Sequence, residues 1–150
     1  MTDLDWLGHL SQSDLLKQIP PAAIESADDL NVAATAIMDY LNSGRELRNK
    51  MRTSGEPEGE ETKLTEELWS NFKKEFCVLV CSKDKKYREE RNALSSTTVG
   101  TLIVAQIACI LGDTMGIATG SLVSFTALTL WTLAKVGKSA FCETVCATAT

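Results

Sequence analysis

Apolar residues recur at three- and four-residue spacing in two long segments of the chain. This spacing predicts amphipathic helices, because residues three and four apart lie on one helical face. The first segment follows Ser26, and its stripe is Leu30, Ala33, Ala34, Ile37, Met38 and Leu41. The second spans residues 62–93, and its stripe is Leu64, Leu68, Phe72, Phe76, Leu79 and Val80.

Shorter apolar patterns and a polar break complete the first half of the chain. Leucines before residue 20 predict one or two short helices, which end at Pro20 and Pro21 because proline disfavours helical backbone in the residue before it. Residues 1–52 are therefore expected to form a helical head. Residues 53–61 (TSGEPEGEE) have the composition of a flexible linker.

The strongest feature is an apolar run of 36 residues, 99–134, whose only charged residue is Asp113. A turn signal containing Gly112, Asp113 and Gly116 divides it, which predicts an apolar helical hairpin over residues 94–135. Neither half carries an amphipathic stripe. A helix that is apolar on every side must be buried on every side, in protein or in lipid.

The membrane is the favoured surrounding for this hairpin. Each half has about 17–20 residues, the minimum for crossing a hydrocarbon core of about 30 Å. Cations flank the run and are absent from its turn, so both termini are expected to be cytoplasmic, with the cations at lipid headgroups. These cations are Lys83, Lys85, Lys86, Arg88, Arg91, Lys135 and Lys138. The alternative is a cytoplasmic helical bundle in which the hairpin is the buried core.

Charge and composition narrow the function classes. The 150 residues include 15 Lys and Arg against 20 Asp and Glu, for a net charge of −5, which excludes a generally basic nucleic-acid binder. The acidic excess lies in residues 1–61, which hold 12 acidic and 5 basic side chains. With 44% hydrophobic and 23% charged residues, the chain is not disordered throughout.

Four of the five cysteines form two CxxxC pairs, Cys77 with Cys81 and Cys142 with Cys146. Each pair places two thiols on one helical face, and if the helices met, four sulfurs would suit zinc or two disulfides. Acylation of Cys142 or Cys146 beside a membrane is a third option. Reduced thiols are the favoured state, because a cytoplasmic chain rarely keeps disulfides. Residues 136–150 are expected to be a short tail.

No paired acid and base, nucleophile elbow, phosphate loop or metal triad stands out, so we expect no enzymatic activity and no cofactor. The fold class is all-α. The predicted function is a small membrane-associated protein whose head binds a protein partner, while the hairpin anchors, oligomerises or perturbs the bilayer. The alternative is an oligomeric helical-bundle adaptor or scaffold. The head core, or a groove for a partner helix, is expected from Leu30, Ile37, Met38, Leu41, Leu68, Phe72 and Phe76.

Overall fold

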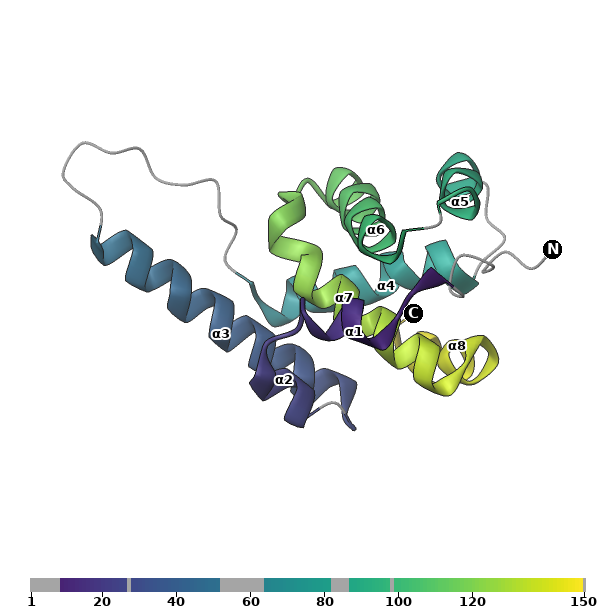
Figure 1. Cartoon of the computed structure of the whole chain (residues 1–150). Coiled ribbons are helices and arrows are strands. Elements are labelled where there is room, and N and C mark those ends of the chain that lie inside the picture. The colour runs from purple at the N-terminus through teal and green to yellow at the C-terminus, as the bar shows by residue number, and fades with distance from the viewer. Residues whose placement is uncertain (1–8, 27, 52–63, 82–86, 98, 150) are drawn as a thin grey trace.

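The fold is all-α over the part of the chain that the structure describes, as the sequence predicts. The structure is a computed structural model, and it describes residues 9–26, 28–51, 64–81, 87–97 and 99–149. Its helices are α1 (Gln12–Leu16), α2 (Pro21–Glu25), α3 (Leu30–Met51), α4 (Glu66–Cys81), α5 (Arg88–Ser95), α6 (Gly100–Met115), α7 (Thr119–Val136) and α8 (Lys138–Ala149). Figure 1 shows α3 extending away from the other helices toward its C-terminal end.

Helix α7 is the centre of the fold. It packs against α1, α3, α6 and α8, and the ring of Phe125 also contacts α4 through Trp69 and Phe72. Every residue from Phe125 to Leu130 is buried. The middle of this half of the hairpin is therefore covered by protein, whereas Val136 at its end is exposed.

Two threonines in this core satisfy their hydroxyl groups within α7 itself. Thr126 Oγ1 donates to the carbonyl oxygen of Leu122 at 2.8 Å, and Thr129 Oγ1 donates to that of Phe125 at 2.7 Å. Both side chains are fully buried. Bonding to the preceding turn removes the cost of burying an unpaired hydroxyl, so threonine is compatible with a helix that is enclosed all round.

Helix α6 buries one face and exposes the other. Its buried residues are Gly100, Ile103, Val104, Ile107, Ala108, Leu111 and Gly112. Leu102, Ala105 and Cys109 lie on the exposed face. None of the helices that the structure describes is both long and apolar enough to cross a membrane. The transmembrane form of the predicted hairpin thus gains no support, although α6 and α7 do pack closely together.

The turn of the hairpin lies later in the chain than the sequence predicts. Gly112 and Asp113 belong to α6, and the left-handed residue that ends this helix is Gly116, with φ of 71°. Gly112 has a packing role instead: a Cβ there would lie 2.6 Å from the carbonyl oxygen of Ile117. Absence of a side chain lets the turn fold back against the helix.

The predicted long helix over residues 62–93 is two helices, α4 and α5. Of the sequence between them, residues 82–86 (SKDKK) contain no apolar side chain, whereas Tyr87, directly before α5, is buried. The linker predicted for residues 53–61 lies outside the described residues. Helices α1 and α3 of the predicted head both pack on α7.

Two hydrogen bonds with the side chain of Asn42 of α3 hold Leu64, which lies just before α4. Asn42 Nδ2 donates to the carbonyl oxygen of Leu64 at 2.8 Å, and the Leu64 amide donates to Asn42 Oδ1 at 3.0 Å. Leu64 itself is buried. The amide of Asn42 therefore satisfies two backbone groups that packing removes from water.

Replacing Asn42 with alanine is expected to lower the free energy of unfolding by about 1–3 kcal/mol, because both backbone groups of Leu64 lose their partner. Urea unfolding followed by circular dichroism measures this change. Asn71→Ala on the exposed side of α4 is the matched control and is expected to stay within about 0.5 kcal/mol of the parent. Equal effects of the two changes would contradict the role of Asn42.

Tyr87 connects α4, α5 and α6. Its ring is buried, its hydroxyl donates to Glu75 Oε2 at 2.6 Å, and it lies 3.2 Å from Thr114 Oγ1. The pKa of Tyr87 is raised to about 12, mainly by burial and to a smaller extent by the hydrogen bond to Glu75. Both favour the neutral phenol, since burial and a nearby carboxylate each penalise the phenolate.

A pH dependence of stability follows from this shift. The pKa of tyrosine in an unfolded chain is about 10. Below that pH the phenol of Tyr87 is protonated in both the folded and the unfolded chain, so its full contribution to the stability of the fold is present. Between pH 10 and 12 only the unfolded chain releases the proton, so stability falls as pH rises. Urea midpoints across this range are expected to fall less in Tyr87→Phe than in the parent. Both proteins should carry Cys109→Ser, which removes the thiolate that would attack disulfides at high pH. If the urea midpoints of the two proteins fell equally with pH, the raised pKa of Tyr87 would be refuted.

Candidate functional site at the paired cysteines

The two CxxxC pairs meet between α4 and α8. Cys77 and Cys81 lie in the last turns of α4, and Cys142 and Cys146 lie in α8. Four-residue spacing places both members of a pair on one helical face. Helices α4 and α8 pack against each other, so all four sulfur atoms gather at one junction.

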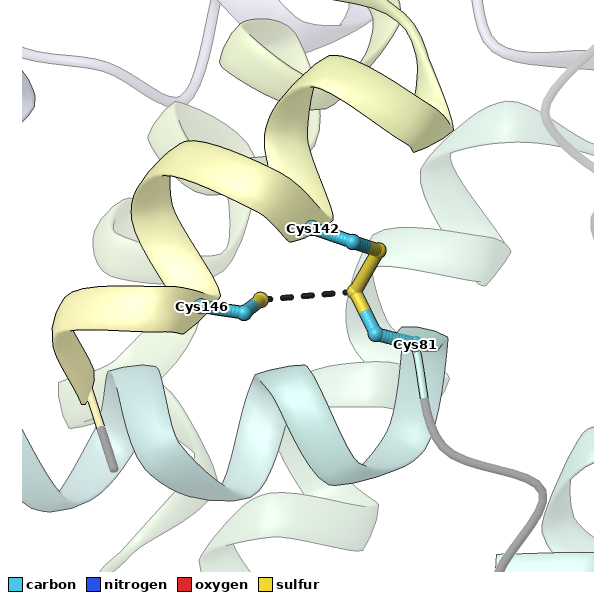
Figure 2. Close-up of side chains that lie close together, drawn as sticks. All are labelled: Cys81, Cys142 and Cys146. Atoms are coloured by element: carbon cyan, nitrogen blue, oxygen red, sulfur yellow. Dashed lines mark hydrogen bonds between the residues drawn. A yellow bond between two sulfur atoms is a disulfide. The ribbon is translucent and has the colours of Figure 1, made fainter.

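Two disulfides join these helices, one between Cys77 and Cys146 and one between Cys81 and Cys142. The first cysteine thus pairs with the last, which requires the two helices to run in opposite directions. Figure 2 shows the Cys81–Cys142 bond, with the Cys146 sulfur pointing toward it. Cys146 Sγ lies 3.3 Å from Cys81 Sγ, so the two disulfides are in contact.

The junction lies at the edge of the aromatic core. The rings of Phe76 and Phe141, the residues before Cys77 and Cys142, meet edge to face at 5.7 Å. Cys77 and Cys146 are 7% and 8% exposed, whereas Cys81 and Cys142 are half-buried. One disulfide is therefore shielded by protein and the other lies at the rim.

This pairing corrects the expectation of reduced thiols. Cys142 and Cys146, for which acylation was a third option, are each bonded to a cysteine of α4. Helix α8 packs on α4 and α7. The matched CxxxC spacing was the signal for this pairing, but it did not show that the two helices are neighbours. Among the described residues, the sulfurs of Cys81, Cys142 and Cys146 form a group close enough to hold a metal ion, within 4.8 Å of one another.

The cations that flank the hairpin do not form one cluster among the described residues. Lys83, Lys85 and Lys86 lie outside them, and Arg88 and Lys138 are exposed. Arg91 donates from Nε to the Leu79 carbonyl and from one terminal nitrogen to the Val78 carbonyl, both at 2.8 Å. A cation at these carbonyls stabilises the C-terminal end of α4. Lys135 lies 3.7 Å from Asp28.

The residues expected as a head core or partner groove lie inside the fold. Ile37, Met38, Leu68, Phe72 and Phe76 are buried, and Leu30 and Leu41 pack partly buried against them. The same helix α3 carries a second apolar stripe on its outer side, which the sequence reasoning did not separate from the first.

This outer stripe is Val32, Ala36 and Tyr40. Val32 is 52% exposed and Tyr40 is 60% exposed. A hollow beside Tyr40 is lined by Ala22 of α2 and by Ala36, Asp39, Tyr40, Leu41, Ser43 and Gly44 of α3. We call these residues, with Val32, the α2–α3 surface. Four-residue steps from Val32 through Ala36 to Tyr40 are the signal that could have identified it.

No family model, curated protein or solved structure matches the chain.

Proposed function

We propose that the chain is a non-enzymatic helical adaptor in which the apolar hairpin is the core and the α2–α3 surface binds a helix of a partner protein. One observation carries the proposal: α3 buries Ile37 and Met38 while its opposite side exposes Val32 and Tyr40 beside a hollow. A half-exposed tyrosine next to an apolar hollow is typical of a binding hot spot.

The charge around this surface indicates the chemistry of the partner. Asp39 lines the hollow, and Glu25, Asp28 and Asp29 are exposed on or between α2 and α3. The best fit is an amphipathic helix with an apolar ridge and basic residues along its flanks. Attraction between opposite charges would speed association and weaken as salt increases.

Photo-crosslinking from position 40 tests this proposal. A photoreactive phenylalanine derivative replaces Tyr40 in the full chain, expressed in the cells that produce it, and the matched control carries it at the exposed Val136. We expect one dominant adduct from position 40 and none from position 136. Its cross-linked peptide, identified by mass spectrometry, should be an amphipathic basic helix. Tyr40→Ala should then weaken binding of that peptide by about 10–100-fold.

Three outcomes decide against a partner helix from another protein at this surface. Equal adducts at both positions would show non-specific capture, and no adduct would leave the surface without an occupant. An adduct with twice the mass of the chain would show that a second copy binds there, which overturns the heterologous partner and supports the homo-oligomer that the sequence led us to expect.

A membrane contact is the second candidate function, and the outer face of α6 favours it. Val99, just before the helix, and Leu102 are 50% and 54% exposed, and Asp113 is the only charged residue from position 99 to the end of α6. Such a face suits the membrane interface rather than its interior. Flotation with anionic vesicles tests it, and Leu102→Asp should abolish recovery in the lipid fraction if α6 is the contact.

The disulfides favour a different location from the one the sequence suggests. Stable disulfides are typical of proteins that mature in an oxidising compartment and are rare in the cytoplasm. We therefore propose an oxidising location for the adaptor, which thiol alkylation before and after reduction of protein taken directly from cells would test. Four alkylated cysteines of the cluster without reduction would contradict it.

A further inference from the structure

We propose that the four paired cysteines, once reduced, form a closed zinc site that holds α4 against α8 in place of the disulfides. The proposal does not depend on the partner of the α2–α3 surface. It assigns the junction two forms, a disulfide form in oxidising conditions and a zinc form in reducing conditions.

Three of the sulfurs lie close enough together to surround one ion once the disulfides are opened. Cys81, Cys142 and Cys146 have their sulfurs within 4.8 Å of one another, and the unbonded pair Cys81 and Cys146 is 3.3 Å apart. Zinc lies about 2.3 Å from each thiolate, which puts neighbouring ligand sulfurs roughly 3.8 Å apart in a tetrahedron. Opening the disulfides moves bonded sulfurs apart toward this separation.

Cys77 supplies the fourth ligand. Its sulfur is bonded to that of Cys146, and the α-carbons of this pair are 5.6 Å apart, close to the 5.8 Å of Cys81 and Cys142. The two helices therefore present the cysteine pairs at nearly equal distances. The sulfur of Cys77 is not among the three that lie within 4.8 Å of one another, so the Cys77 side chain must rotate for its thiolate to reach the same centre. Three intervening residues also fall within the usual spacing of zinc-binding cysteines.

Burial makes this a closed site. Cys77 and Cys146 are 7% and 8% exposed, and the rings of Phe76 and Phe141 pack beside them. Four protein thiolates would occupy all four tetrahedral positions and leave none for water, although Cys81 and Cys142 lie at the rim, and this is the arrangement of structural rather than catalytic zinc.

The chemistry balances with a dithiol reductant. Each disulfide accepts two electrons and two protons from one dithiol, which leaves as its own disulfide, so two dithiols generate four cysteine thiols. Binding of one Zn²⁺ to four thiolates then releases four protons to water. In the reverse direction, two molecules of a disulfide oxidant accept the four electrons and four protons and leave as dithiols, while the ion leaves and the two sulfur–sulfur bonds form again.

Cobalt titration of the full chain tests the site. The chain is reduced with a phosphine, which competes weakly for metal, and Co²⁺ is added without oxygen. We expect one Co²⁺ per chain with the visible absorption of tetrahedral thiolate cobalt, displaced by one Zn²⁺. Zinc should also raise the midpoint of thermal unfolding of the reduced chain, because an ion bound only by the folded site stabilises that state.

Variants separate this site from metal capture by loose thiols. Cys109→Ser removes the remaining cysteine, which is exposed and outside the cluster, and should change nothing. Cys142→Ser should weaken Co²⁺ binding at least tenfold. Cys77→Ser should alter the cobalt spectrum toward three sulfurs and one oxygen. No binding by the reduced parent, no rise in its midpoint, or an unchanged spectrum in Cys77→Ser would overturn the closed four-cysteine site.

Discussion

Replacing all four paired cysteines with alanine is expected to lower the midpoint of thermal unfolding by roughly 12–28 °C. Cys77 and Cys146 are 69 residues apart in sequence, and loop-closure entropy gives such a crosslink about 4 kcal/mol. The Cys81–Cys142 bond closes only a small additional loop once the first is present, and adds about 2–3 kcal/mol. For a chain of this size, each kcal/mol corresponds to about 2–4 °C.

Differential scanning calorimetry measures this effect, and the design of the variants isolates its source. Alanine at Cys81 and Cys142 alone should produce less than half of the full loss, because Cys77–Cys146 still closes the long loop. Cys109→Ala is the matched control, since Cys109 is exposed and outside both disulfides, and should keep the parent midpoint. A four-alanine variant that melts within about 2 °C of the parent would contradict the stapled junction.

Replacing Phe125 with alanine is expected to reduce the free energy of unfolding by about 3–5 kcal/mol, because a large buried ring leaves a cavity. Phe125 is fully buried, and its ring lies 5.0 Å from that of Trp69 and 5.8 Å from that of Phe72. These two contacts join α7 to α4. Their loss adds to the cavity term, since paired aromatic rings stabilise each other beyond their burial.

Urea unfolding without detergent measures the effect of Phe125→Ala. The midpoint should fall while the slope with denaturant is unchanged, which shows that stability rather than compactness has changed. Val136→Ala at the exposed end of α7 is the control and should stay within about 0.5 kcal/mol. A loss below about 1 kcal/mol in Phe125→Ala would mean that α7 does not form the protein core.

Helix type and approximate position were predictable from the sequence, but the surroundings of the hairpin were not. The stripes that contain Ile37 and Phe72 have a clear helical period, and both residues are buried. In α7 the period disappears because neighbours cover every side, which leaves the same pattern that lipid would produce. Only the positions of distant segments distinguish these cases.

The candidate site shows the same division between local and distant information. The spacing of Cys77 and Cys81 identified a shared face, and Cys142 with Cys146 did the same. Their pairing depends on α8 lying against α4, which no local pattern encodes. The sequence placed the hairpin turn too early because the turn signal contains two glycines with different roles. Gly112 lies within α6 and makes room for the close approach of Ile117, whereas Gly116 adopts the positive φ that ends the helix.

Hydrogen exchange of the oxidised full chain in detergent-free buffer tests most directly whether the hairpin is the core of a self-contained helical bundle. The amides of α7 from Phe125 to Leu130 should be among the slowest to exchange and should open only with global unfolding, while those on the exposed side of α6 exchange sooner. Fast exchange throughout α7, or a chain that remains in solution only with detergent, would contradict the account.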